Sequence, residues 1–263
     1  MPGRTVALTH REQGRGIPLV LLHGYPHDAT LWEPQVETLS AHARVLAPDL
    51  RGFGATRPGP GGATVDDYAA DVRALLDSLS IPRAVVCGLS LGGYVALAFA
   101  ANHPEALQGL VLVSTRPGAD TAAAKDAREA GAKKALAEGT PALSEAMVPK
   151  MLSPATAARS PNLVEKVRAM MARQPKEGVA QALRAMASRP DRTPMLSSIR
   201  APTLVVHGAA DTLIPPVEAE GMATAIRGSG LVIVPDAAHL PNLEAPALFD
   251  REIQAFLSRL PHA

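Results

Sequence analysis

The sequence predicts an α/β fold with a mostly parallel central sheet, flanked by helices and interrupted by a helical insertion. Segments with helical periodicity alternate with short apolar runs, and this alternation is typical of parallel sheets. The runs are apolar without interruption, as expected of strands buried on both faces. The predicted strands are residues 19–22, 44–47, 84–87, 110–113, 203–206 and 231–234, and residues 5–11 are expected to form an outer strand able to pair antiparallel.

Residues 65–79 carry the clearest helical pattern. Their apolar positions recur at the spacing of one face of an amphipathic helix. Thr64, followed three residues later by Asp67, has the pattern of a capping box with Asp in place of Glu. The closing segment, residues 249–260, has a similar apolar stripe and is expected to form the last helix.

Residues 116–195 differ in composition from the rest of the chain. They contain no aromatic residue and no histidine, yet hold six of the eight methionines. Prolines divide the stretch into short helical patches. Because one crossover between strands needs far fewer residues, the stretch predicts a cap. We therefore expect an α/β core at 1–115 and 196–263 and a helical cap at 116–195.

Composition excludes several classes of partner. Lys and Arg number 26 and Asp and Glu 25, so a net charge of +1 provides no field that would attract nucleic acid or an anionic membrane. No apolar stretch reaches the length of a membrane span, and the first residues lack a signal-peptide pattern. The single cysteine, Cys87, cannot form an internal disulfide. We expect a cytoplasmic protein with no nucleic-acid or membrane partner, whose oligomeric state is not predicted.

The run Gly88-Leu89-Ser90-Leu91-Gly92 joins a predicted buried strand to an alanine-rich helical segment. A serine in this context sits on a strained turn, where a Cβ atom at either glycine position would collide with backbone. The turn exposes Oγ, and the helix N-terminus favours developing negative charge. A glycine-rich turn with a serine N-cap is the alternative, but the flanking strand and helix favour Ser90 as a nucleophile.

Two late loops supply an acid and an imidazole. Asp211 and His239 each follow a predicted strand, so both are expected at the sheet edge that carries Ser90. Ser90 would attack, His239 would transfer its proton, and Asp211 would orient the imidazole. Asp120 and Asp236 are weaker rivals, since Asp236 is too close to His239 in the chain and Asp120 follows an earlier strand.

The run His23-Gly24-Tyr25-Pro26 directly follows the first buried strand. A loop in this position can donate one backbone N–H to an oxyanion, while the residue after the nucleophile donates the other. The expected donors are the amides of Tyr25 and Leu91, because Pro26 has no N–H. Hydrogen bonding within the loop is the expected role of His23.

With the run Asp-Leu-Arg-Gly-Phe-Gly at 49–54, these motifs resemble the α/β-hydrolase superfamily over nearly the whole chain. Within it, the sequence is similar to small bacterial carboxylesterases, near the enol-lactonase and non-haem haloperoxidase branches. The resemblance implies the α/β-hydrolase fold, a triad in the order Ser, Asp, His, and hydrolysis with no cofactor. No metal ion is expected, because no group of Cys, His, Asp or Glu has metal-ligand spacing. Asp49 and Arg51 are expected to tie their loop together.

These observations predict a serine carboxylesterase that hydrolyses small to medium carboxylic esters through an acyl-enzyme, with a small-molecule ester as its partner. A lactonase of the enol-lactonase type and a cofactor-free haloperoxidase or perhydrolase are alternatives. A ligand-binding receptor with a hydrolase fold is the non-enzyme alternative. The expected pocket is lined by apolar side chains, namely Trp32, Met147, Met151, Met170, Met171, Leu213, Ile214 and Leu240.

Overall fold

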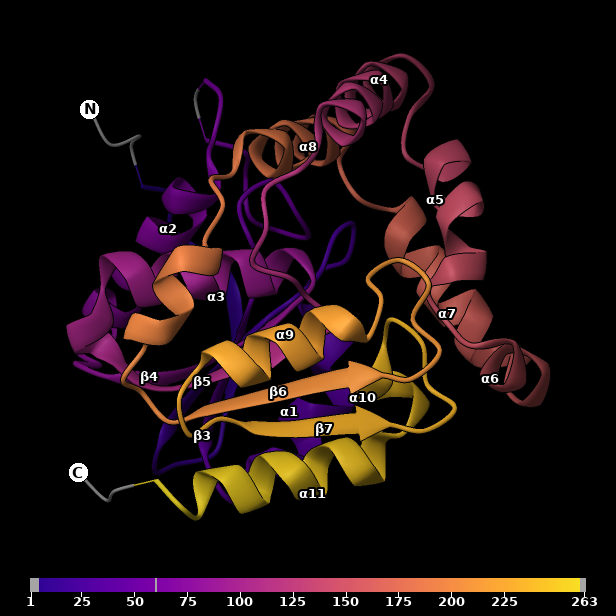
Figure 1. The fold of residues 1–263 in the computed structure, drawn as a ribbon. Helices are drawn as coiled ribbons and strands as arrows, with labels where there is room; N and C mark the ends of the chain where they lie inside the picture. Colours follow the sequence, from indigo (N-terminus) through magenta and orange to yellow (C-terminus); the bar gives the residue numbers. More distant parts are fainter. Residues whose placement is uncertain (1–4, 60, 261–263) are drawn as a thin grey trace.

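A seven-stranded sheet forms the centre of the computed structural model, which describes residues 5–59 and 61–260 (Figure 1). Its strand order is β1-β3-β2-β4-β5-β6-β7, and every neighbouring pair is parallel except β1 with β3. This architecture confirms the predicted α/β-hydrolase fold. The strands are β1 (His10–Gln13), β2 (Pro18–Leu22), β3 (Arg44–Pro48), β4 (Ala84–Leu89), β5 (Leu107–Val113), β6 (Thr203–Gly208) and β7 (Gly230–Val234).

Helices cover both faces of the sheet. Figure 1 shows α2, α3 and α9 on one side and α11 on the other, and α1 lies with α11, because the buried residues of these two helices belong to one cluster. The two layers follow from the two-residue period of a strand, since Val20 and Leu22 belong to one buried cluster and Leu19 and Leu21 to the other. The helices are α1 (Glu33–Leu39), α2 (Val65–Ser78), α3 (Leu91–Asn102), α4 (Ala122–Glu138), α5 (Pro141–Met147), α6 (Pro154–Arg159), α7 (Pro161–Ala172), α8 (Lys176–Ser188), α9 (Val217–Ala225), α10 (Pro241–Glu244) and α11 (Pro246–Leu257).

The outer strand is shorter than predicted and begins at His10. Two amides that precede it donate to side chains instead of to a neighbouring strand. The Val6 N–H donates to Asp71 Oδ1 at 2.8 Å, and the Thr9 N–H donates to Thr56 Oγ1 at 2.9 Å. Because these amides are taken by side chains, the antiparallel edge strand is short, although the Thr9 carbonyl still accepts from the Asp49 N–H at 2.9 Å.

The predicted capping box at the start of α2 is confirmed. The Asp67 N–H donates to Thr64 Oγ1 at 3.2 Å, and the Thr64 N–H donates to Asp67 Oδ2 at 2.8 Å. Because both orphan amides are satisfied reciprocally, the helix start is set by these two side chains.

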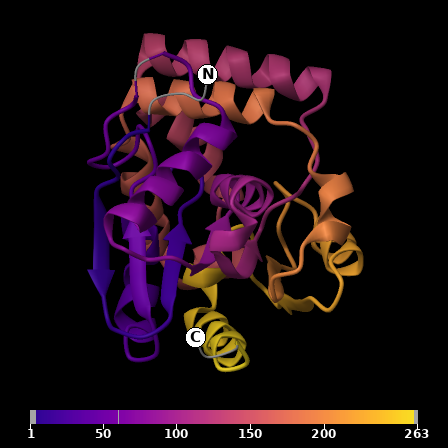
Figure 2. The same cartoon turned by 90° about the vertical axis from the view of Figure 1, so that its left-hand side faces the viewer.

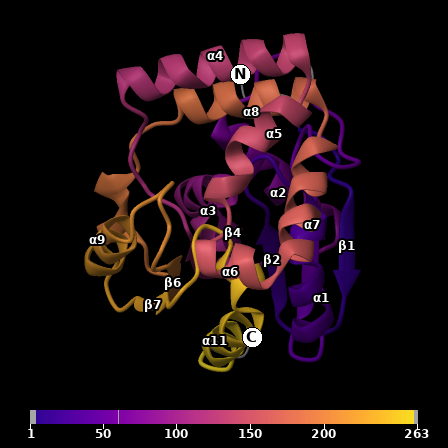
Figure 3. The ribbon, with the colours of Figure 1, turned by 90° about the vertical axis from the view of Figure 1, so that its right-hand side faces the viewer.

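Residues between β5 and β6 form the five helices α4 to α8, which lie beyond the end of the sheet. Figures 2 and 3 show α4 and α8 running side by side across this end from opposite sides. The division of the chain into a core and a separate cap stays a prediction. Within residues 5–59 and 61–260, no helix has the length and apolar character needed to cross a membrane.

Candidate active site

Ser90 occupies the turn between β4 and α3 with φ of 53° and ψ of −110°. This left-handed backbone is disfavoured for a residue with a side chain, so the turn is strained. A Cβ atom on Gly88 would lie 2.1 Å from the carbonyl oxygen of Gly92, and one on Gly92 would lie 2.2 Å from that of Leu22. Both glycines are therefore required by close backbone contacts, as the sequence predicted.

His239 and Asp211 lie in loops that follow β7 and β6, and the structure joins them by a hydrogen bond. The distance from His239 Nδ1 to Asp211 Oδ2 is 2.7 Å, and both side chains are buried. The Leu213 and Ile214 amides donate to Asp211 Oδ1 at 2.9 and 3.1 Å. The acid is thus held on both oxygens.

The surroundings of Asp211 favour its ionised form. Burial alone would raise the pKa of this carboxyl, but hydrogen bonds from His207 and His239 outweigh it and lower the pKa well below its ordinary value. His207 Nε2 lies 3.4 Å from Asp211 Oδ2 and donates to the Ile214 carbonyl at 2.8 Å. Because an ionised carboxylate only accepts hydrogen bonds, Nδ1 of His239 carries the proton and its Nε2 is left as an acceptor.

Ser90 and His239 line one cavity of about 120 Å³ at the carboxyl end of the sheet. Loops that follow the strands contribute part of its wall, and α3, α4, α5 and α8 each contribute a side chain. Within residues 5–59 and 61–260, no group of three or more His, Cys, Asp or Glu side chains is arranged to hold a metal ion. The other lining residues are Tyr25, Tyr94, Arg116, Arg128, Met147, Met151, Met186, Leu213 and Ile214.

The cavity lining agrees with only part of the predicted pocket. Met147, Met151, Leu213 and Ile214 line it as expected. Trp32 is instead completely buried, with its ring 5.9 Å from that of Phe249 in the core beside α11. The structure corrects the prediction for four residues, which are buried outside the lining of this cavity: Trp32, Met170, Met171 and Leu240.

Four lining residues were missed in the sequence. Tyr94 follows the glycines of the turn, and Arg116 follows the end of β5, so position after a strand or motif was a usable signal for these two. Arg128 and Met186 lie inside α4 and α8, where nothing in the local sequence distinguishes them from neighbouring side chains.

The two rival acids lie elsewhere. Asp120 is paired with arginines, among them Arg116 at 2.8 Å. Asp236 is exposed and has φ of 57°, so it shapes the turn before His239. Among the described residues, the acid hydrogen-bonded to His239 is therefore Asp211.

The loop after β2 is held from within by His23, as predicted. His23 Nε2 accepts from the Leu50 N–H at 2.9 Å, so Nδ1 carries the proton and donates to the Gly24 carbonyl at 2.8 Å. Burial lowers the pKa of this imidazole, which favours the neutral form that these two bonds need. A Cβ atom on Gly24 would lie 3.3 Å from Ser90 Cβ, so the loop passes close to the serine.

The backbone amides of Tyr25 and Leu91, the two predicted oxyanion donors, make no hydrogen bond within the described residues. The Tyr25–Pro26 peptide bond is cis. Leu91 opens α3, where the first amides of a helix have no partner within the helix. Both amides are therefore available to a ligand.

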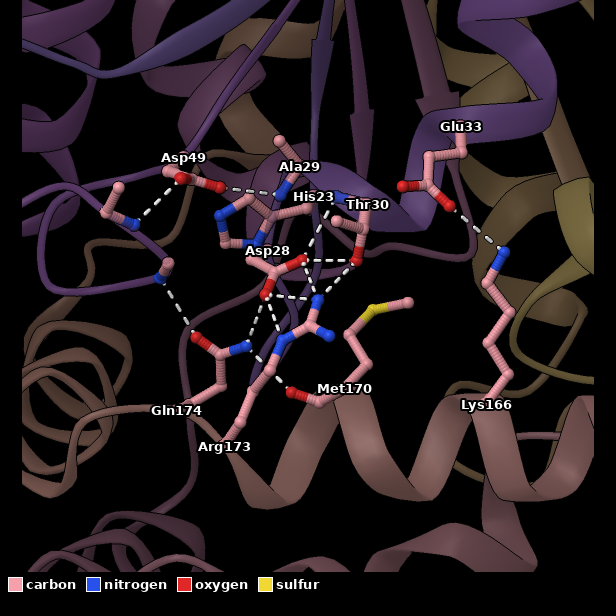
Figure 4. A network of polar contacts seen from close by, with 12 residues as sticks. His23, Asp28, Ala29, Thr30, Glu33, Asp49, Lys166, Met170, Arg173 and Gln174 are labelled. Carbon is pink, nitrogen blue, oxygen red and sulfur yellow. Dashed lines mark hydrogen bonds and ion pairs between the residues drawn. The ribbon is translucent and has the colours of Figure 1, made fainter.

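A second set of contacts ties the far end of this loop to the end of α7 (Figure 4). Asp28 accepts from Arg173 Nε at 2.9 Å and from Gln174 Nε2 at 2.8 Å. Gln174 Oε1 in turn accepts from the Gly54 N–H at 3.0 Å. The loop that carries Tyr25 is thus linked to the helical segment above the sheet.

Asp49 and Arg51 tie their own loop, as expected. Asp49 Oδ1 accepts from the Ala29 N–H at 2.8 Å, and Oδ2 accepts from the Ala55 N–H at 2.9 Å. Arg51 forms a buried ion pair with Asp71 at 2.7 Å and lies outside the lining of the cavity.

Comparison with known proteins gives the same fold and several activities. Residues 17–246 match the family model described as alpha/beta hydrolase fold. A thermophilic esterase from Thermogutta terrifontis, solved with malate bound, is 40% identical and superposes with a TM-score of 0.95 over 97% of this chain and 94% of that chain.

Two lactonases are similar over most of their length. The enol-lactonase from Burkholderia xenovorans LB400 is 32% identical, with a TM-score of 0.89 over 96% of each chain. The 3-oxoadipate enol-lactonase 2 of Acinetobacter baylyi is 29% identical over 92% of this chain and 88% of its own. Several other curated relatives align with this chain over only about two fifths of their length.

Proposed function

Since the chain belongs to the alpha/beta hydrolase fold family, we propose that it is a serine carboxylesterase in which Ser90, His239 and Asp211 form the catalytic triad. One observation carries the proposal. Ser90 is held at a positive φ in the same cavity as His239, whose imidazole is held by a buried carboxylate. The esterase and enol-lactonase relatives, which match over nearly their full length, support hydrolysis of an ester bond.

The hydrogen bonds determine how protons move in the first step. With its proton on Nδ1, His239 has a free electron pair on Nε2. This nitrogen takes the hydroxyl proton of Ser90 as Oγ attacks the carbonyl carbon of the ester. The imidazolium that forms is stabilised by the negative charge of Asp211, which itself stays ionised.

The tetrahedral intermediate carries its negative charge on the former carbonyl oxygen. The amides of Tyr25 and Leu91 donate to this oxygen. When the intermediate collapses, the bond to the alcohol oxygen breaks and the imidazolium of His239 returns its proton to that oxygen. The acyl group stays on Ser90 until a water molecule, deprotonated by His239, attacks it and releases the acid.

The cavity favours a short acyl group. Its volume of about 120 Å³ is smaller than the roughly 300–1,000 Å³ of pockets for drug-sized ligands. Methionine side chains, which adapt to groups of varied shape, form part of its wall. We therefore expect the best substrates to have acyl chains of a few carbons.

The test compares ester hydrolysis by the wild type with that by Ser90→Ala. The variant is expected to lose activity by more than about 10⁴-fold, because the covalent route is removed. A burst of alcohol before the steady state would report the acyl-enzyme. Ser80→Ala is the matched control, since Ser80 also has a positive φ, of 55°, but lies exposed outside the cavity. Turnover by Ser90→Ala at the wild-type rate would contradict the proposal.

Lactone hydrolysis is the second candidate, favoured by two enol-lactonase relatives that align over nearly the whole chain. The same steps would open a ring, with the alcohol retained in the product. A panel of open esters, lactones, and hydrogen peroxide with a halide separates the candidates by kcat/KM. A preference for lactones over open esters of equal acyl length would identify a lactonase, and halogenation would identify a perhydrolase.

A further inference from the structure

Three arginines surround one carboxylate in the wall of the candidate active site. Asp120, whose side chain is fully buried, forms ion pairs with Arg116 at 2.8 Å, with Arg189 at 2.8 Å and with Arg128. Among residues 5–59 and 61–260, no other carboxylate forms an ion pair with these guanidiniums. Since Arg stays charged at any physiological pH, the group carries two positive charges in excess of its carboxylate.

Two of the three arginines face the site. Arg116 and Arg128 line the same cavity as Ser90, whereas Arg189 lies outside that lining and stacks 4.1 Å from the ring centre of Tyr94. Their side chains are also largely shielded, with 29% of Arg116 and 21% of Arg128 exposed. The excess positive charge therefore acts at the place where a substrate binds.

Donors in the cavity are left without acceptors. Among the described residues, the buried Nε of Arg116 and the buried hydroxyl of Tyr25 have no hydrogen-bond partner. The remaining acid near the cavity, Asp211, is already bonded to His239. A buried donor without an acceptor is costly, as is a charge that nothing compensates. A bound anion would satisfy both needs.

We propose that the substrate is an anionic ester, a half-ester of a short dicarboxylic acid, whose free carboxylate is bound by Arg116 and Arg128. The planar guanidinium matches a carboxylate with two parallel hydrogen bonds, which favours a carboxylate over a neutral polar group. Met147 and Met186 line the same cavity, so they would contact the methylene chain between the two carbonyl groups. This inference rests on the proposed function of Ser90 as the nucleophile.

The first experiment measures charge selectivity. The kcat/KM of the wild type is compared for monomethyl glutarate, which is anionic, and methyl pentanoate, which is neutral. We expect a preference for the anion of about 10- to 100-fold, the range of hydrogen bonds to charged groups. Arg116→Gln and Arg128→Gln should each reduce this ratio at least about tenfold, while Arg116→Lys, which keeps the charge, should retain more of it.

Arg184→Gln is the matched control. It removes an arginine from α8, but this one is exposed and paired with Glu129 on the outer surface at 2.9 Å. We expect it to leave the ratio unchanged, because screening weakens an exposed charge. Each cavity variant still leaves Asp120 paired with two arginines, so we expect the variants to fold. A thermal unfolding transition at the wild-type temperature would show this. A wild type that does not favour the anion, or an equal ratio in Arg128→Gln, would overturn the inference.

A binding measurement separates this inference from the proposed function. Glutarate, the product of the first assay, is titrated calorimetrically into Ser90→Ala and into Ser90→Ala with Arg128→Gln. We expect binding to the first and at least about tenfold weaker binding to the second. If the wild type hydrolyses neither ester but glutarate binds in this Arg128-dependent way, the proposed function fails and anion recognition stands. If the esters are hydrolysed and glutarate binds equally to both variants, the inference fails alone.

Discussion

Asp28 links α7 to the loop that carries Tyr25, and the substitution Asp28→Asn tests whether this link stabilises the fold. Asp28 is buried, and each of its oxygens accepts from more than one donor. Oδ1 accepts from the amide of Thr30 at 3.0 Å, from its hydroxyl at 2.5 Å and from Arg173 Nη2 at 2.9 Å. Oδ2 accepts from Arg173 Nε at 2.9 Å and from Gln174 Nε2 at 2.8 Å.

Asn has one acceptor oxygen, so either orientation of the amide places its NH₂ against at least two donors. The orientation that keeps Thr30 loses the bonds from Arg173 Nε and Gln174. Arg173 is 51% exposed and can bond to water instead, so the loss of its Nε hydrogen bond should cost only about 1 kcal/mol. Gln174 is buried, and losing its bond to a charged acceptor should cost about 1.5 kcal/mol. We expect the free energy of unfolding to fall by about 2–3 kcal/mol.

The assay is urea unfolding of the wild type and Asp28→Asn at pH 7, with Asp77→Asn as control. Asp77 pairs with Arg73 on an exposed helix face and should cost less than about 0.5 kcal/mol. Burial would raise the pKa of Asp28, but its hydrogen-bond donors outweigh burial and hold the pKa below the ordinary value of 3.8. The stabilisation by ionised Asp28 is therefore complete above pH 3.8 and lost as pH falls through the lower folded-state pKa.

The effect of the substitution should depend on pH, because only the ionised form of Asp28 accepts all of these bonds. The difference in unfolding free energy between wild type and Asp28→Asn should be largest near pH 7 and should shrink below pH 3.8. A variant that loses less than about 0.5 kcal/mol at pH 7 would contradict this expectation. So would a difference that stays constant down to pH 2, because it would show that the charge of Asp28 is not what stabilises the network.

Three further predictions concern the site and its frame. Asp211→Asn should lower kcat by about 10⁴-fold, because the imidazole loses its orienting charge; a loss below tenfold in a steady-state assay would contradict this. Gly92→Ala should lower the free energy of unfolding, measured in urea, by at least about 3 kcal/mol, since its Cβ would lie 2.2 Å from the Leu22 carbonyl oxygen. The control Gly221→Ala, in open space on α9, should be neutral or slightly stabilising. Burial raises the pKa of the Cys87 thiol, so Ellman's reagent should modify it only in denaturant, and rapid labelling of the native protein would count against this.

Several features could be predicted because their causes lie close together along the chain. The capping box at Thr64 and Asp67 needs only the three-residue spacing of a helical turn. A strand that is buried on both faces is apolar at every position, so each continuous apolar run can be identified as a buried strand without reference to the rest of the chain. The collision that requires Gly88 is with the carbonyl of Gly92 in the same turn. Ser90 could be singled out for the same local reason.

The position of the acid and the base needed one additional rule. Asp211 and His239 lie after different strands, and sequence alone places them at one edge only because parallel strands end on the same side of a sheet. The hydrogen bond of 2.7 Å between them, and the second histidine that contacts the acid, His207, are visible only in the structure.

The lining of the cavity shows where local patterns stop being informative. Met170 and Met171 were predicted to line the pocket, but the sequence could not say what their face of α7 contacts. In the structure this face of α7 packs into the core, and Met186 of α8, which was not predicted, lines the cavity. Trp32 was displaced from the predicted pocket in the same way, by its contact with Phe249.

The fold, the strained turn at Ser90 and the pair of loops that carry Asp211 and His239 could thus be predicted from the order of the residues. Each of these features depends on the spacing of residues along the chain or on the direction of a strand, and both can be inferred from a sequence pattern. The character of the cavity, including the excess positive charge in the wall that it shares with Ser90, depends on how the helices pack in three dimensions. That charge exists because Arg116, Arg128 of α4 and Arg189 at the end of α8 meet around Asp120, and no local pattern specifies how α4 and α8 pack together.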